Sequence, residues 1–148
     1  MTVQLWIVHE DRVLLRLHEK FGLWFGVGGH IDPGEDPLEA AHREAMEEVG
    51  LTVTIPGEPD YSHHSGPVDL PPPAFINRHP VGGGRDHFNL EYLALAHSSQ
   101  ITQPDNHEKT VCKWCTREDI AAIPDDALLP NARRYALAAL DRLGSKSI

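Results

Sequence analysis

The stretch of residues 29–51 constrains the fold of this chain more than any other part of its sequence. Asp36 and Pro37 are typical of a helix start and Gly50 of a helix end, so a helix is expected over residues 37–49. Three glutamates fall within an arc of roughly 100° on this helix, and they are Glu44, Glu47 and Glu48. An adjacent apolar stripe that can face a sheet is formed by Leu38, Ala45 and Val49.

Three carboxylates on one helix face repel one another. One interpretation is a helix face that is simply solvated. A hard divalent cation would also remove the repulsion, and carboxylate oxygen is the ligand that Mg²⁺ and Mn²⁺ prefer. Magnesium held by few carboxylates keeps coordination positions open for phosphate oxygens. The spacing of the glutamates therefore favours a metal site suited to phosphoryl chemistry.

The net charge and its position narrow the choice of ligand. The 148 residues carry a formal charge of −9, which excludes a basic nucleic-acid-binding protein and argues against an anionic membrane surface. Seven acids and one base lie within residues 32–48, so this segment alone contributes −6. Bound divalent cations would reverse much of that local field. The acidic balance therefore still allows a polyphosphate ligand that arrives together with metal.

Composition also indicates the class of protein. No run of about 18 apolar residues is present, and the first residues lack a basic stretch followed by a small-residue cleavage site. Two cysteines, Cys112 and Cys115, are too few for a secreted disulfide scaffold. We therefore expect a cytoplasmic protein that does not associate with membranes.

Hydrophobic periodicity predicts mixed strands and helices. Strands are expected at residues 2–9 and 13–17, which form a hairpin, near 21–29, and at 51–55, 88–97 and 110–116. Helices are expected at residues 37–49, 117–122 and 131–143. Residues 56–85 contain seven of the twelve prolines and five of the twelve glycines and are expected to be irregular. The pattern indicates a layered α/β or α+β domain.

Residues 29–51 resemble the Nudix box, which is Gly, five residues, Glu, seven residues, then Arg-Glu-(large aliphatic)-any-Glu-Glu-any-Gly-(large aliphatic). The matching positions are Gly29, Glu35, Arg43, Glu44, Glu47, Glu48, Gly50 and Leu51. Ala45 stands where a larger aliphatic residue is usual, and Val27 precedes the glycines where many members have proline. Both departures leave the carboxylates in place.

The resemblance implies an α/β fold, the Nudix-type α/β/α sandwich, with a mixed β-sheet and the box glutamates on the first helix. Residues 1–148 are then expected to form a single Nudix hydrolase domain. The implied reaction is hydrolysis, dependent on Mg²⁺ or Mn²⁺, of a nucleoside diphosphate linked to another moiety X, by attack of water on phosphorus. A nucleoside triphosphate pyrophosphatase is favoured, and a nucleotide-sugar or dinucleoside polyphosphate hydrolase is the alternative.

Two other classes share the fold. A non-catalytic nucleotide sensor would be expected to have lost box carboxylates, and all of them are present here. An isomerase of isoprenoid diphosphates relies on a cysteine near the diphosphate, whereas both cysteines here lie on a late predicted strand. The sequence favours the hydrolase.

The same resemblance implies roles for the box residues. Glu44 and Glu48 are expected to be the main metal ligands, with Glu47 as a third and a backbone carbonyl of Gly28 completing the site. Arg43 is expected to orient the carboxylates through its planar guanidinium. Glu47, Glu48 and Arg43 would thus contribute to catalysis.

Three further residues have roles implied by the family. Glu35 is expected to fix the loop to the helix. The general base of Nudix enzymes is either a box glutamate or a glutamate from a loop before a late strand, and Glu108 occupies such a loop; an exposed loop acid is the alternative. Arg16 resembles the basic residue that contacts substrate phosphate, and an ordinary surface arginine is the alternative.

Substrate selectivity in the family generally comes from outside the box, and residues 56–85 form the longest irregular stretch. Phe75, Asn77 and Arg78 are candidate contacts to a base or a phosphate. His87 and Asn89 share a strand face and are further candidates.

The cysteines and the oligomeric state complete the expectations. Cys112 and Cys115 are three apart on a predicted strand and should point to opposite faces, so a shared metal is not expected. The expected partner is a small-molecule nucleoside diphosphate derivative, with no nucleic acid duplex. A homodimer through an exposed hydrophobic edge of the first hairpin is possible.

Overall fold

A computed structural model describes residues 1–63, 66–103 and 110–145 of the chain. Its centre is an eight-stranded sheet. The strands are β1 (Thr2–His9), β2 (Arg12–His18), β3 (Leu23–Phe25), β4 (Val27–His30), β5 (Val53–Thr54), β6 (Phe75–Gly82), β7 (Arg85–Ala96) and β8 (Cys112–Cys115). The helices are α1 (Pro37–Val49), the 3₁₀ turn η1 (Tyr61–His63), α2 (Arg117–Ala122) and α3 (Pro130–Leu143).

The sheet is mixed, as expected. Its order is β3-β2-β1-β7-β5, with β4 paired to β1, β6 to β7 and β8 to β2. Strands β1 and β7 run parallel, and the other pairings are antiparallel. Because β1 also pairs with β4 and β7, and β2 also pairs with β3 and β8, the first hairpin lies inside the sheet. The expectation of an exposed hairpin edge is therefore wrong.

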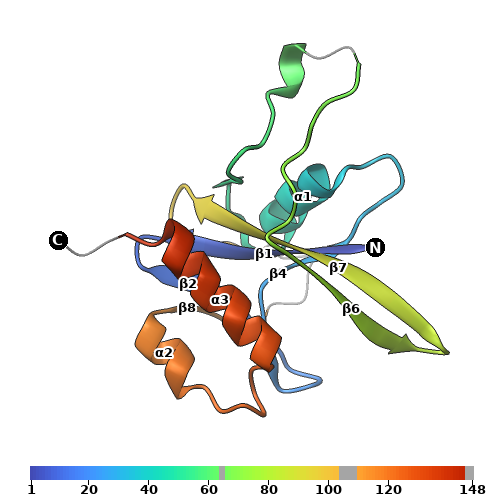
Figure 1. Cartoon of the computed structure of the whole chain (residues 1–148). Helices are drawn as coiled ribbons and strands as arrows, with labels where there is room; N and C mark the ends of the chain where they lie inside the picture. Colours follow the sequence, from blue (N-terminus) through green and yellow to red (C-terminus); the bar gives the residue numbers. More distant parts are fainter. Residues whose placement is uncertain (64–65, 104–109, 146–148) are drawn as a thin grey trace.

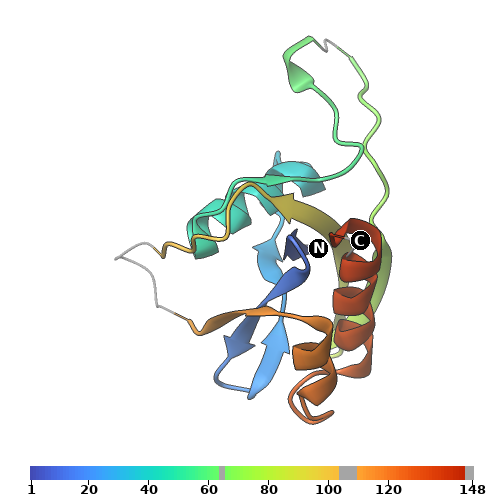
Figure 2. The ribbon, with the colours of Figure 1, turned by 90° about the vertical axis from the view of Figure 1, so that its left-hand side faces the viewer.

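Helices cover both faces of the sheet, so the predicted α/β/α sandwich is confirmed. Figures 1 and 2 show α1 on one side and α2 with α3 on the other. Side chains alternate along β1, where Leu5 and Ile7 pack in the core under α1 while Trp6 and Val8 pack in the core under α3. No helix in the described ranges is long and apolar enough to cross a membrane.

Helix α1 has the bounds that the sequence predicts, because its ends are specified chemically. The Asp36 carboxylate accepts a hydrogen bond from the Glu39 N–H, and the Glu39 side chain accepts one from the Asp36 N–H. Gly50 ends the helix with a φ of 65°, which favours glycine. The predicted stripe of Leu38, Ala45 and Val49 is buried against the sheet. Helix α2 also matches its prediction, and α3 begins one residue earlier than predicted.

Strand β6 corrects the expectation that residues 56–85 are irregular throughout. Residues 75–82 pair with β7 and form a hairpin that extends beyond the rest of the sheet (Figure 1). Gly83 and Gly84 supply the positive φ angles of its turn. Pro80 is tolerated because β6 is an edge strand that pairs with β7 alone. On such a strand the missing N–H of proline can face solvent without interrupting the hydrogen bonds between strands.

Candidate active site

Two glycines in β4 make close contacts, Gly28 with the backbone of β1 and Gly29 with Glu44 of α1. A Cβ atom on Gly29 would lie 2.5 Å from Oε1 of Glu44, and one on Gly28 would lie 2.0 Å from the carbonyl oxygen of Val3. At Gly28 the obstruction is backbone, so only glycine fits, whereas a larger residue at Gly29 would displace the Glu44 carboxylate. The carboxylates of Glu44 and Glu48 thus lie directly against the β4 backbone.

Glu48 is partly buried and is bonded to two groups of the sheet. Its Oε2 atom accepts a hydrogen bond from Nη1 of Arg16 at 2.6 Å and another from the Gly28 N–H at 3.2 Å. Burial raises the pKa of Glu48 to about 7; Arg16 opposes this increase, and the neighbouring Glu44 adds to it. The Gly28 N–H, and not its carbonyl, is therefore the group that contacts a box glutamate. The sequence led us to expect the Gly28 carbonyl to complete the metal site.

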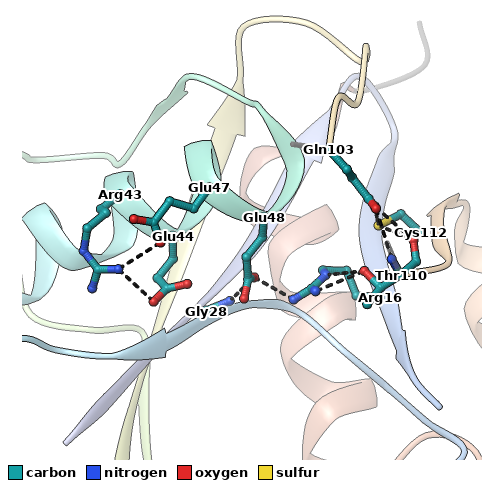
Figure 3. Close-up of polar contacts among 9 residues, drawn as sticks. All are labelled: Arg16, Gly28, Arg43, Glu44, Glu47, Glu48, Gln103, Thr110 and Cys112. Carbon is teal, nitrogen blue, oxygen red and sulfur yellow. Dashed lines mark hydrogen bonds and ion pairs between the residues drawn. The ribbon is translucent and has the colours of Figure 1, made fainter. Parts of the chain in front are cut away.

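Arg43 links the loop before α1 to the glutamate face, which consists of Glu44, Glu47 and Glu48. Figure 3 shows its contacts with Glu44 and Glu47. Its Nε and Nη2 atoms donate to Glu35 at 2.7 and 2.9 Å, and its Nη1 atom lies 3.1 Å from Glu44 and 3.2 Å from Glu47. Nη2 also donates to the carbonyl oxygen of His30 at 3.0 Å. The hydrogen bond from Arg43 lowers the pKa of Glu35. Glu35 therefore fixes the loop to the helix, as predicted.

Arg16 lies on β2 between Glu48 and a hydroxyl group that the sequence did not single out. Its Nε and Nη2 atoms donate to Oγ1 of Thr110 at 3.2 and 3.0 Å. The side chain of Gln103 in turn holds Thr110. Thr110 and Gln103 belong to no motif with a characteristic spacing, so the sequence does not mark them as site residues. The pairing of β2 with β8, which sets Arg16 opposite Cys112, brings them to the site.

An open cleft of about 520 Å³ adjoins the glutamate face. Its lining includes Arg16, His18, Lys20, Gly28 and Glu48. Two other surface hollows border α2 and α3 and contain none of the box glutamates. The cleft thus combines an acidic wall with basic side chains, a combination suited to a metal-bound phosphate ligand.

Within the described ranges, no three or more His, Cys, Asp or Glu side chains are oriented so that they could bind one metal ion together. The ion pairs explain this, because Arg43 holds Glu47 and Glu44 while Arg16 holds Glu48. The donor set nevertheless fits a hard divalent cation, since Glu44 and Glu48 are carboxylates close enough for one to raise the pKa of the other. A cation held between them would relieve that repulsion.

The candidate selectivity residues do not gather at the glutamate face. Phe75 packs against Tyr135 of α3 with ring centroids 4.6 Å apart, and Asn77 donates a hydrogen bond to Glu91, so both lie on the sheet face opposite α1. Arg78 is exposed on the β6–β7 hairpin. Predicted contacts of Phe75 and Asn77 with a substrate would therefore need a ligand that reaches around the sheet.

The remaining predicted residues fall into three groups. Glu108 lies outside the described residues. Cys112 packs in the core under α1 and Cys115 in the core under α3, which confirms that they point to opposite faces. His87 and Asn89 share a face of β7, where the His87 ring lies 5.3 Å from that of His30.

Curated proteins with similar sequences include two named RNA pyrophosphohydrolase. The protein from Rhizobium meliloti (strain 1021) is 50% identical over 50 residues, which is 32% of this chain and 30% of that protein. The protein from Mesorhizobium japonicum is 35% identical over 98 residues, which is 64% of this chain and 56% of that protein. Both alignments thus cover less than two thirds of the relative's length.

A solved structure extends the similarity over nearly the whole chain. The crystal structure of a hydrolase of the NUDIX family from Clostridium perfringens superimposes with a TM-score of 0.80 at 31% identity, covering 96% of each chain. The family model described as the NUDIX domain matches residues 2–139. With the box residues in place on α1 and this match over most of its length, the chain belongs to the Nudix family.

Proposed function

We propose that the protein is a hydrolase, dependent on Mg²⁺ or Mn²⁺, that cleaves the phosphoric anhydride bond of a nucleoside diphosphate linked to a moiety X. One observation carries the proposal: Glu44 and Glu48 lie against the Gly28–Gly29 backbone, and Glu48 lines a cleft that also contains Arg16. Arg43 pairs with Glu44 on the same face. Nucleoside triphosphates, which would release pyrophosphate, are the favoured substrates.

Each residue at the glutamate face has a distinct task in this proposal. Glu44 and Glu48 would hold the divalent cation, with Glu47 as a third ligand, and Arg43 links these carboxylates to the loop before α1. When bound, the cation supplies positive charge to the phosphoryl oxygens and acidifies a water molecule. Arg16, His18 and Lys20 line the cleft and would bind the substrate phosphates.

Water attacks phosphorus, the bridging P–O bond breaks, and the water proton passes to a general base. Glu108 remains our prediction for that base, with a box glutamate as the alternative. The products are two phosphate compounds, and for a nucleoside triphosphate they are a nucleoside monophosphate and pyrophosphate.

The test is a panel of nucleoside diphosphate derivatives assayed with Mg²⁺ and with Mn²⁺, following release of phosphate, pyrophosphate and nucleoside monophosphate. We expect turnover by the wild type and a loss of kcat by orders of magnitude in Glu48→Gln, because a charged ligand becomes a neutral one. Glu39→Gln is the matched control, since it removes the same charge from an exposed turn of the same helix. Full activity of Glu48→Gln would refute the assignment.

RNA with a 5′-triphosphate end is a second candidate substrate, because a relative 35% identical over 98 residues is named RNA pyrophosphohydrolase. The reacting group is the same triphosphate, whereas the charge of −9 opposes contacts with an RNA backbone. Including such an RNA beside free nucleotides, nucleotide sugars and dinucleoside polyphosphates in the panel decides among them. Nucleotide binding without turnover of any compound would indicate a sensor instead.

A further inference from the structure

The side-chain amide of Gln103 forms hydrogen bonds with both backbone groups of Thr110, as the backbone of a paired β-strand does. Its side-chain Nε2 donates to the carbonyl oxygen of Thr110 at 2.9 Å, and its Oε1 accepts from the N–H of Thr110 at 3.0 Å. The same Nε2 lies 3.4 Å from Sγ of Cys112. One amide therefore satisfies both backbone groups of Thr110 just before β8 begins, and Thr110 is held at a fixed position.

Thr110 transmits this constraint to Arg16. Its hydroxyl oxygen accepts from both Nε and Nη2 of Arg16, so the forked contact fixes the plane of the guanidinium. The third donor, Nη1, is thereby directed at Oε2 of Glu48, at 2.6 Å. Figure 3 shows the residues in this order, from Gln103 through Thr110 and Arg16 to Glu48.

The segment that carries Gln103 is itself attached to the end of α1. The N–H of Thr102 donates to the carbonyl oxygen of Val49 at 2.9 Å, and the Thr102 side chain packs directly on Gly50. The contacts therefore close a ring: from the end of α1 through Thr102 and Gln103 to Arg16, and back to Glu48 in the last turn of the same helix.

We propose that Gln103 is a positioning residue of the active site, which acts through Thr110 to hold the Arg16 guanidinium against Glu48 at the edge of the cleft. The importance of this position for turnover rests on the proposed function, in which Glu48 holds metal and Arg16 binds phosphate. Without the amide, the guanidinium loses its fixed plane, and both the carboxylate and the phosphate contact lose their orientation.

The first experiment compares matched variants in the hydrolase assay. Gln103→Leu keeps the size of the side chain and removes both hydrogen-bonding groups, whereas Gln100→Leu makes the same change at an exposed position of the same segment. We expect kcat/KM to fall about tenfold in Gln103→Leu, as for a small misplacement of a reacting group, and to stay unchanged in Gln100→Leu. Thr110→Val should show the same loss of kcat/KM. Thr110→Ser, which retains the hydroxyl, should keep the wild-type kcat/KM.

A double-mutant cycle then separates positioning from a general structural role. If Gln103 acts through Arg16, Gln103→Leu should cause no further loss of kcat/KM in an Arg16→Ala background. Multiplicative losses in the double variant would overturn the proposal, as would equal effects of Thr110→Val and Thr110→Ser.

A second readout does not depend on turnover. The Arg16 Nε–H signal in a ¹H–¹⁵N NMR spectrum is assigned by its absence in Arg16→Lys, and its exchange with water is measured. We expect exchange to be about tenfold faster in Gln103→Leu than in the wild type or in Gln100→Leu. Unchanged exchange would overturn the positioning role. Faster exchange in a protein that hydrolyses no compound of the panel would support the positioning role and refute the proposed function.

Discussion

Glu91 is a buried carboxyl group that lies apart from the glutamate face. Its side chain is on the α3 side of β7 and only 1% exposed. Oε2 accepts from the indole N–H of Trp6 at 2.7 Å, and Oε1 accepts from the amides of Asn77 and Asn89. Burial raises the pKa of Glu91 to about 7, and the three hydrogen bonds oppose that increase without cancelling it.

This group should make the stability of the protein depend on pH. The folded state binds the Glu91 proton more tightly than the unfolded chain, so the free energy of unfolding falls as the pH rises from about 4.5 to 7, by about 3 kcal/mol at most. In Glu91→Gln the side chain does not titrate, and this part of the fall should disappear. Urea denaturation at pH 5, 6, 7 and 8 measures it.

The exposed Asp11→Asn variant is the control for this measurement and should follow the wild-type curve. The difference between wild type and Glu91→Gln isolates Glu91 from Glu48, whose pKa is also raised. Parallel curves for wild type and Glu91→Gln would show that Glu91 does not titrate in this range.

The sequence predicted side-chain contacts between residues close together along the chain. It missed contacts between residues that are far apart in the sequence. The contact of Arg43 with Glu35 spans only eight positions, across the start of α1, and the box spacing encodes it. The partners of Arg16 are 32 and 94 positions away, so its ion pair with Glu48 and its bonds to Thr110 depend on strand pairing that no local pattern specifies.

Among the elements, α1 matters most because it carries the box glutamates, and its N-terminus depends on Asp36. That carboxylate accepts from the Glu39 N–H at 2.8 Å and from the Tyr61 hydroxyl at 2.6 Å. Asp36→Ala should lower the free energy of unfolding by about 1–2 kcal/mol and Tm by about 4 °C. Thermal unfolding followed by circular dichroism measures this shift.

Asp36→Asn is the matched variant, since asparagine caps helices about as well as aspartate. It should retain most of the wild-type Tm. If alanine and asparagine at position 36 gave the same Tm as the wild type, the cap would contribute nothing to the fold.

The bounds of α1 were predictable, whereas strand β6 was not. Helix α1 has a capping box at one end and a left-handed glycine at the other, and its bounds follow from the sequence. Strand β6 has Pro80 within it and Gly82 at its end, signals that favour a loop. Only pairing with β7 makes residues 75–82 a strand, and that pairing also turns Phe75 and Asn77 toward α3.

For the molecule as a whole, the proposed function depends most on how the negative charge is distributed along the chain. Residues 32–48 contribute −6 of the formal charge of −9. Arg43, which is already counted in that −6, pairs with Glu44 and Glu47, while Arg16 pairs with Glu48 and offsets one further charge. The glutamate face thus retains an excess of negative charge that a divalent cation would neutralise, so folding and metal binding should be coupled.

Adding metal should therefore raise Tm. A ligand that binds only the folded state at 100 times its Kd stabilises it by about 2.7 kcal/mol, which for a chain of this length raises Tm by about 5 °C or more. Thermal unfolding is measured with Mg²⁺ or Mn²⁺ and again after addition of EDTA, which should reverse the shift. Glu48→Gln should lose most of the shift, whereas Glu39→Gln, which removes the same formal charge outside the glutamate face, should keep it. Equal shifts in the two variants would mean that the cations respond to the overall charge of residues 32–48 and occupy no site built from Glu44 and Glu48.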